Sequence, residues 1–252
     1  MTGMMPSVQV VFPRHVLCVL GEGLDLDLLA RIARETPGVD FDPADAASAA
    51  DPRMARAFRA SLTNATFEDA DWDAVERHDT VAYLLSEPVR RAAAADVAAR
   101  MLALVARLFE AGATAVKNES SGLTHGRARW LELASTAAEG NPDRRIVALY
   151  RAWVKRPIQH DHLVYSCGLH LLGVPDVEVA GGTVDDVPAM DAFAGYLLLE
   201  RPALYSGDTF RAEPGAKRWT VEHRADDRYP GDDFFHNPFG IWRLSPWGAA
   251  SR

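Results

Sequence analysis

The chain has 252 residues, of which 48% are hydrophobic and 25% are charged. This length and composition are typical of a folded globular protein with one large domain or two half-size ones, and they exclude an intrinsically disordered protein. The 27 basic and 35 acidic residues give a net charge of −8. Nucleic acid is therefore not expected as a partner, because phosphate binding depends on clustered Lys and Arg.

The sequence shows no pattern typical of export or of membrane insertion. Pro13, Arg14 and His15 interrupt the N-terminal apolar run that begins at Val8. No stretch reaches the roughly 18 apolar residues that a membrane span requires. The two cysteines, Cys18 and Cys167, lie in apolar runs and are expected as buried thiols. We therefore expect a cytoplasmic protein that does not contact membranes.

The first elements follow the order strand, turn, helix, strand. Val16–Leu20 is an apolar run of strand type, and Gly21–Gly23 predicts a tight turn after it. Apolar residues recur every fourth position over Leu24–Ile32, which indicates a helix. Val39–Pro43 predicts a brief strand, and the Ala- and Asp-rich connection that ends near Pro52 is the best candidate for a mobile loop.

A strand, a helix and a second strand follow. Val81–Leu85 predicts a buried strand, and Ser86 is expected to cap a helix over Val89–Ala111. Ala113–Lys117 then returns to an extended pattern. The helix has one apolar stripe, formed by Val97, Met101, Val105 and Leu108.

A second unit of similar order is expected further along the chain. Its segments are the apolar run Ile146–Tyr150, the block Tyr165–Val179 ending in a strand over Val177–Val179, a helix over Asp186–Glu200, and extended Thr209–Ala212 and Arg218–His223. We therefore predict an α+β fold in which two half-modules, about 14–117 and 144–224, share one mixed sheet with helices packed on it. The aromatic segment 229–247 is expected to dock on the core of this single domain.

Four short motifs carry a resemblance to a known family. They are Tyr165–Val179, Tyr196–Pro202, Gly207–Phe210 and Asn237–Leu244. Together they resemble bacterial proteins of domain-of-unknown-function family 4261, over roughly Thr80–Leu244. The resemblance implies a shared fold and brings no known activity with it.

A metal site is one candidate for chemistry. His160 and His162 lie two residues apart, so an extended backbone would place both imidazoles on one side. Two histidines do not complete the three or four ligands that zinc usually takes. We predict an exposed polar turn here, with no metal and no cofactor.

Nucleophilic catalysis is a second candidate. Cys167 and His170 are three residues apart, and one helical turn would place a thiol and a base on the same face. With His125 and the carboxylates of Asp176 and Glu178, they would suit a small hydrolase or transferase. The alternative is a buried thiol beside a hydrogen-bonded core histidine in an apolar turn.

The third candidate is a binding groove. Asp176 and Glu178 alternate with valines, so both carboxylates share one strand face and are expected to face solvent or a groove. The turn that carries Ser121, His125 and Arg129 would form the other wall. Because no catalytic constellation is complete, our leading hypothesis is a non-enzymatic module that binds a protein partner or associates with itself.

Overall fold

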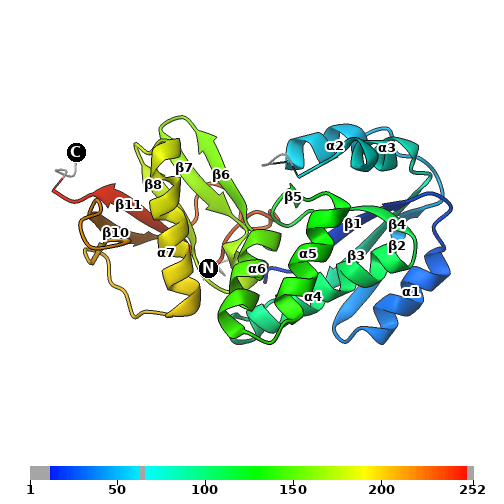
Figure 1. Cartoon of the computed structure of the whole chain (residues 1–252), viewed down its shortest axis with the longest axis horizontal. Helices are drawn as coiled ribbons and strands as arrows, with labels where there is room; N and C mark the ends of the chain where they lie inside the picture. The colour runs from blue at the N-terminus through cyan, green and yellow to red at the C-terminus, as the bar shows by residue number, and fades with distance from the viewer. Residues whose placement is uncertain (1–11, 63–65, 249–252) are drawn as a thin grey trace, which may run out of the picture.

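A computed structural model describes residues 12–62 and 66–248, so the N-terminal run before Phe12 lies outside the described residues. The chain forms two β-sheets with helices packed on them, and the predicted α+β class is confirmed (Figure 1). The prediction of one shared sheet is wrong. The first sheet ends at the two-residue strand Leu123–Thr124, and the strands from Lys155 onward pair with one another in a separate ladder.

The first sheet is entirely antiparallel, with the order β2-β3-β1-β4-β5. Its elements, in chain order, are β1 (Val16–Gly21), α1 (Leu26–Glu35), β2 (Val39–Ala47), α2 (Met54–Ser61), α3 (Asp69–Arg77), β3 (Thr80–Ser86), α4 (Ala94–Glu110), β4 (Ala113–Asn118) and β5 (Leu123–Thr124). Without α2, α3 and β5, this is the β-α-β-β-α-β arrangement of ferredoxin-like folds.

Both faces of this sheet are covered, which explains why β1 is apolar at almost every position. Leu17 and Val19 pack with α1 and α4, whereas Cys18 and Leu20 pack with Met54 and other side chains of α2 and α3. Figure 1 shows α2 and α3 on one side of the sheet and α1 and α4 on the other. A strand buried on two faces has no wet face on which polar residues could alternate.

Two boundaries in this half differ from the predictions. The helix α4 begins at Ala94, after a short 3-10 turn η1 (Arg91–Ala93), and not at Val89. The hydroxyl of Ser86 accepts a hydrogen bond from the backbone N–H of His15 at 2.9 Å, so it ties two chain segments together instead of capping the helix. The strand β2 continues to Ala47, so part of the expected loop is sheet.

The second sheet is mixed, with the order β6-β7-β8-β11-β10-β9. Its elements are β6 (Lys155–His160), β7 (Leu163–Cys167), the 3-10 turn η2 (Leu169–Leu172), β8 (Asp176–Ala180), the 3-10 turn η3 (Val184–Asp186), α7 (Val187–Leu199), β9 (Thr209–Phe210), β10 (Trp219–Arg224) and β11 (Ile241–Pro246). The strands β8 and β11 pair in parallel, and the other neighbours pair antiparallel.

The run Ile146–Tyr150, which takes the place of an opening strand in the predicted second unit, is helical. It lies within α6 (Pro142–Trp153), which follows α5 (Arg127–Ala138). Asn141 caps α6 through its side chain, and Pro142 occupies its first turn. A short apolar run does not distinguish a strand from one buried helix face, and here the cap residues decide.

The aromatic segment 229–247 contributes a strand to the sheet itself, because β11 lies between β8 and β10. Trp242 is buried, whereas Phe234 and Trp247 are exposed. One continuous cluster of buried apolar side chains includes Leu17 of the first sheet and Val177 of the second. Within the residues that the structure describes, no helix is long and apolar enough to cross a membrane.

Met101 is fully buried at the centre of the α4 stripe, as the sequence predicts. We expect Met101→Asp to unfold or aggregate the protein, because burial of an unpaired carboxylate costs several kcal/mol, comparable with the stability of a whole domain. Ala103→Asp, on the exposed side of the same helix, is the matched control. Soluble yield and thermal midpoint are the measurements, and equal values for the two variants would contradict the packing described here.

Candidate functional site

The segment Tyr165–Val179 forms most of β7, the turn η2 and most of β8 in the second sheet. Its apolar residues Leu169, Leu171, Leu172 and Val177 are all buried. Gly168 has a φ of 121°, and a Cβ at this position would lie 2.4 Å from the carbonyl oxygen of Trp153 and 2.9 Å from Cβ of Ser121. Only glycine therefore allows this segment to approach the first half so closely.

Asp176, the first residue of β8, has no exposed surface and accepts hydrogen bonds from three chain segments. Its Oδ1 accepts from the hydroxyl of Ser166 at 3.0 Å and from the backbone N–H of Leu169 at 3.1 Å. Its Oδ2 accepts from the side-chain amide of Asn237 at 2.9 Å. Both lone-pair regions of the buried carboxylate are thus satisfied.

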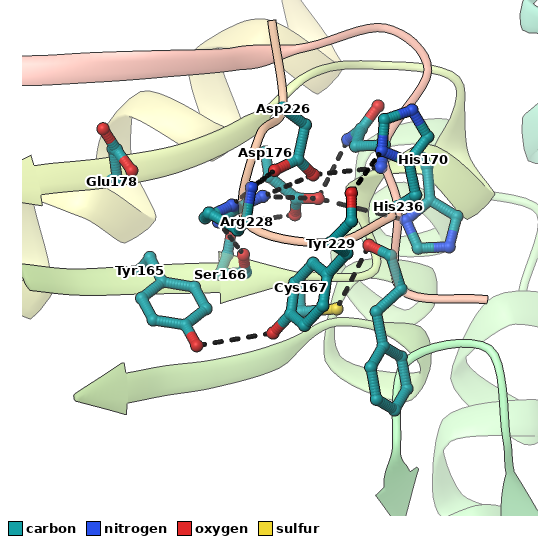
Figure 2. Close-up of polar contacts among 12 residues, drawn as sticks. Tyr165, Ser166, Cys167, His170, Asp176, Glu178, Asp226, Arg228, Tyr229 and His236 are labelled. Atoms are coloured by element: carbon teal, nitrogen blue, oxygen red, sulfur yellow. Dashed lines mark hydrogen bonds and ion pairs between the residues drawn. The ribbon is translucent and has the colours of Figure 1, made fainter. Parts of the chain in front are cut away.

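The segment that runs from β10 to β11 supplies the positive charge beside Asp176. The guanidinium of Arg228 lies 3.6 Å from Oδ2 of Asp176 and also donates to both oxygens of Asp226, at 2.8 and 3.0 Å. The backbone N–H of Asn237 donates to Asp226 at 3.0 Å. We call Ser166, Asp176, Asp226, Arg228 and Asn237 the Asp176 cluster, and Figure 2 shows the side chains of Ser166, Asp176, Asp226 and Arg228 converging.

The charges of the cluster are mutually stabilised. Burial alone raises the pKa of Asp176, but His170, Arg228 and Asn237 together lower this pKa below its ordinary value. Burial lowers the pKa of Arg228, and the carboxylates of Asp226 and Asp176 outweigh burial and raise it. The pair is therefore ionised, as buried charges that are both paired and hydrogen-bonded can be.

The prediction that Asp176 and Glu178 face solvent or a groove is wrong, because both are buried, at 0% and 1% exposure. Their strand does have one apolar face, formed by Val177 and Val179, but the other face is also covered. Arg228 covers it over Asp176, and Arg243 of the neighbouring strand pairs with Glu178. Glu178 lies apart from the Asp176 cluster (Figure 2).

We expect Asp176→Asn to lower the free energy of unfolding by about 3 kcal/mol, because the new amide would set its own N–H donors against buried groups that donate to the carboxylate. Glu178→Gln is the matched control on the same strand. Its partner Arg243 has a side chain that is 28% exposed and can turn to water, so we expect a loss of about 1 kcal/mol. Urea unfolding measures the free energy of unfolding of both variants, and equal losses would show that the Asp176 cluster stabilises the fold no more than the Glu178–Arg243 pair does.

The other three predicted groove residues lie elsewhere. Ser121 is buried and accepts a hydrogen bond from Asn118, and Nε2 of His125 lies 3.3 Å from the carbonyl oxygen of Ala152. Arg129 pairs with Glu132 on the surface of α5. Neither of the two cavities described below is lined by any of the five predicted groove residues.

The side chains considered for catalysis are buried in environments that do not suit a nucleophile or a general base. Burial raises the pKa of Cys167 well above its ordinary value, so its thiol stays protonated. Burial also lowers the pKa of His125 to about 4. His170 has no exposed surface, and its Nδ1 lies 3.9 Å from Oδ2 of Asp176, beyond hydrogen-bonding distance.

Another buried histidine, His15, precedes β1 and packs edge-on against Trp153, with ring centroids 4.6 Å apart. Neither of its ring nitrogens has a hydrogen-bond partner among the described residues. Burial, with the nearby His170, lowers the pKa of His15 from 6.5 to about 3. His15 is therefore neutral in the folded protein at neutral pH.

This depressed pKa predicts sensitivity to acid. Between pH 6.5 and pH 3 the unfolded chain protonates His15 and the folded chain does not, so stability is full above this window and is lost as pH falls through it. The loss approaches ~1.4 kcal/mol for each pH unit. We expect His15→Phe to flatten the dependence of urea unfolding on pH, and His162→Phe, at an exposed position, to leave it unchanged.

His160 and His162 flank Asp161 at the exposed end of the β6–β7 hairpin, where Asp161 has a φ of 50°. This is the polar turn that the sequence predicts. Across residues 12–62 and 66–248, no group of three or more His, Cys, Asp or Glu side chains is arranged to hold a metal ion.

A cleft of about 780 Å³ lies beside the turn between η2 and β8. Its walls come from η1 and α4, from Leu172–Pro175, from the end of α7 with the following residues 201–206, and from Phe239 and Trp242. A volume of this size falls in the range of ligand pockets. A second cavity, of about 870 Å³, lies against the first sheet, and its basic groups Arg53 and Lys117 are already paired with acids.

The Asp176 cluster positions one wall of this cleft. The side-chain amide of Asn237 donates to Asp176 and, at 3.1 Å, to the carbonyl oxygen of Val174. Its Oδ1 accepts from the backbone N–H of Phe239 at 2.9 Å. Val174 and Phe239 both line the cleft, so one buried amide fixes two of its wall residues.

The sequence alone does not indicate which residues line this cleft. They come from six separate stretches of the chain, at 91–95, 146, 172–175, 197–206, 223 and 239–242. The motifs 165–179, 196–202 and 237–244, singled out for their resemblance to a family, each contribute lining residues. Comparison of the chain with protein-family models, with curated proteins and with solved structures found no match.

Proposed function

We propose that this protein is a non-enzymatic protein-interaction module, and that its cleft receives an apolar segment of a protein partner. The observation that carries the proposal is the cleft itself, which has walls of Leu172, Leu197, Leu204 and other apolar side chains beside an exposed Tyr205. Grooves of this kind bind the apolar face of a partner segment. A cleft anchored by a buried ionic cluster is also preorganised, which reduces the entropy cost of binding.

The alternative is a small hydrolase or transferase that uses Cys167, His170 and His125 with Asp176 and Glu178. It has less support, because the pKa values of the Cys167 thiol and of the His125 imidazole are shifted away from those of a nucleophile and a base that act near neutral pH.

The setting that we propose is a reducing bacterial cytoplasm, in keeping with two buried and free cysteines and with the resemblance to domain-of-unknown-function family 4261. The net charge of −8 favours a protein partner over nucleic acid. A second copy of the chain is the other candidate occupant of the cleft, and it is an outcome of the test below.

The test is selection of a displayed random peptide library on the immobilised full chain. Ala203 is exposed and lines the cleft, so the indole of Ala203→Trp should fill it, whereas Ala138→Trp places the same side chain at an exposed position of α5. We expect selected peptides to bind the parent chain and Ala138→Trp, and to lose at least tenfold in affinity for Ala203→Trp, about 1.4 kcal/mol.

Two results count against this proposal. Peptides that bind all three chains equally would show that the cleft is not the interaction site. Sedimentation analysis that shows self-association of the parent chain and a monomeric Ala203→Trp would identify a second copy, and not a different protein, as the occupant.

A further inference from the structure

We infer that the cleft recognises a carboxylate carried by an apolar peptide segment, and that Arg91 and Arg201 bind this charge. The inference rests on the proposed function, since it names the chemistry of the partner segment that the cleft receives. The proposed function depends on the shape and apolar lining of the cleft, whereas this inference depends on the charges at the cleft.

The charges that line the cleft have one sign. Arg91 and Arg201 line it, and no Asp or Glu among the described residues does. The whole chain has 27 basic and 35 acidic residues, so composition alone would favour acids at such a surface. Cationic groups in a cleft with apolar walls favour an anionic and apolar occupant.

Neither arginine has a counter-ion among the residues that the structure describes. Arg100 pairs with Glu87 and Arg145 with Asp96, whereas described arginines outside the cleft, such as Arg90 and Arg151, also stand outside any ion pair. What distinguishes Arg91 and Arg201 is that both line a cleft to which no described Asp or Glu contributes.

Arg91 is exposed and is held at the cleft wall. Its guanidinium lies over the ring of Phe239, 4.8 Å from the ring centroid, and Phe239 is positioned by Asn237. Its backbone also packs closely on Gly173, where a Cβ would lie 2.9 Å from the carbonyl oxygen of Arg91. Stacking of this kind limits the side chain to few conformations, which favours binding of an anion.

Arg201 follows the end of α7 with a φ of 47°, in the left-handed region where helices usually place glycine. A side chain at this position costs free energy that glycine would not. The position thus carries a charged side chain at the cleft in spite of the backbone cost. Arginine donates two parallel hydrogen bonds to a carboxylate, which suits it to this role.

The test uses two dyes with the same aromatic body. Anilinonaphthalene sulfonate carries an anion, and N-phenylnaphthylamine does not. In fluorescence titrations of the folded full chain at low salt, we expect the sulfonate to bind about tenfold more tightly than the neutral dye. Arg91→Gln and Arg201→Gly should each remove most of this difference and leave the affinity for the neutral dye unchanged.

Three controls separate the possible causes. Arg151→Gln, at an exposed position outside the cleft, should change neither affinity, and Ala203→Trp should weaken both dyes. The thermal midpoint of Arg201→Gly should be equal or higher, because glycine fits the left-handed backbone. If Arg201 had only a structural role, its replacement would not weaken sulfonate binding while leaving stability unchanged or higher. A lower affinity for the sulfonate in such a variant therefore supports direct binding of the anion.

The last arm uses peptides selected on the parent chain. We expect them to be enriched in Asp or Glu beside apolar residues, and Glu→Gln or Asp→Asn exchange should weaken their binding about tenfold. The inference is overturned if both dyes bind equally, if the arginine variants change nothing, or if selected peptides lack acids. If selected peptides still lose affinity for Ala203→Trp in any of these cases, the proposed function stands and only the inference about the carboxylate fails. Failure of the inference and failure of the proposed function are therefore distinguishable.

Discussion

The buried carboxylate of Asp176 is the constraint on which the second half of the molecule depends. Its oxygens accept hydrogen bonds from Ser166 at the end of β7, from Leu169 at the start of η2, and from Asn237 before β11. An ionised group without contact with water needs all of its hydrogen-bond partners. The free-energy penalty of a missing hydrogen bond to such a group is larger than the net stabilisation that the bond gives when it forms. The carboxylate therefore fixes the relative positions of these three segments.

The cleft follows from this arrangement. Asn237 joins the wall residues Val174 and Phe239 to Asp176, and Phe239 in turn carries the guanidinium of Arg91. The polar cluster lies in the protein interior and the apolar lining lies at the surface, with the turn before β8 between them. A rigid support behind a binding surface keeps its shape in the absence of a ligand.

The sequence predicts most of the elements but little of their assembly. Apolar periodicity identifies β1, α4 and the valine face of β8, because these patterns depend on neighbours along the chain. Alternation in β8 predicts two faces and cannot show that Arg228, about fifty residues later, covers the polar one. The pair Asn141-Pro142 is typical of a helix start and marks the beginning of α6. The apolar run Ile146–Tyr150 inside this helix has the pattern of a strand, which makes the helix hard to recognise from the sequence. The cleft was not predicted, because its walls meet only in the folded chain.

The position of β11 has a consequence for the order in which the chain can fold during synthesis. The first sheet needs no residue beyond Thr124, so it can close while later segments are still being made. The second sheet has β11 between β8 and β10, and residues 241–246 are synthesised after both of these neighbours. Until β11 is synthesised, one edge of β8 has no partner strand, and Asp176 lacks the hydrogen bond from Asn237. The nascent chain therefore exposes a strand edge that can pair with a wrong strand. Trp153 and Ser121, against which Gly168 packs, are both synthesised before Gly168, so this turn can take its place before β11 exists.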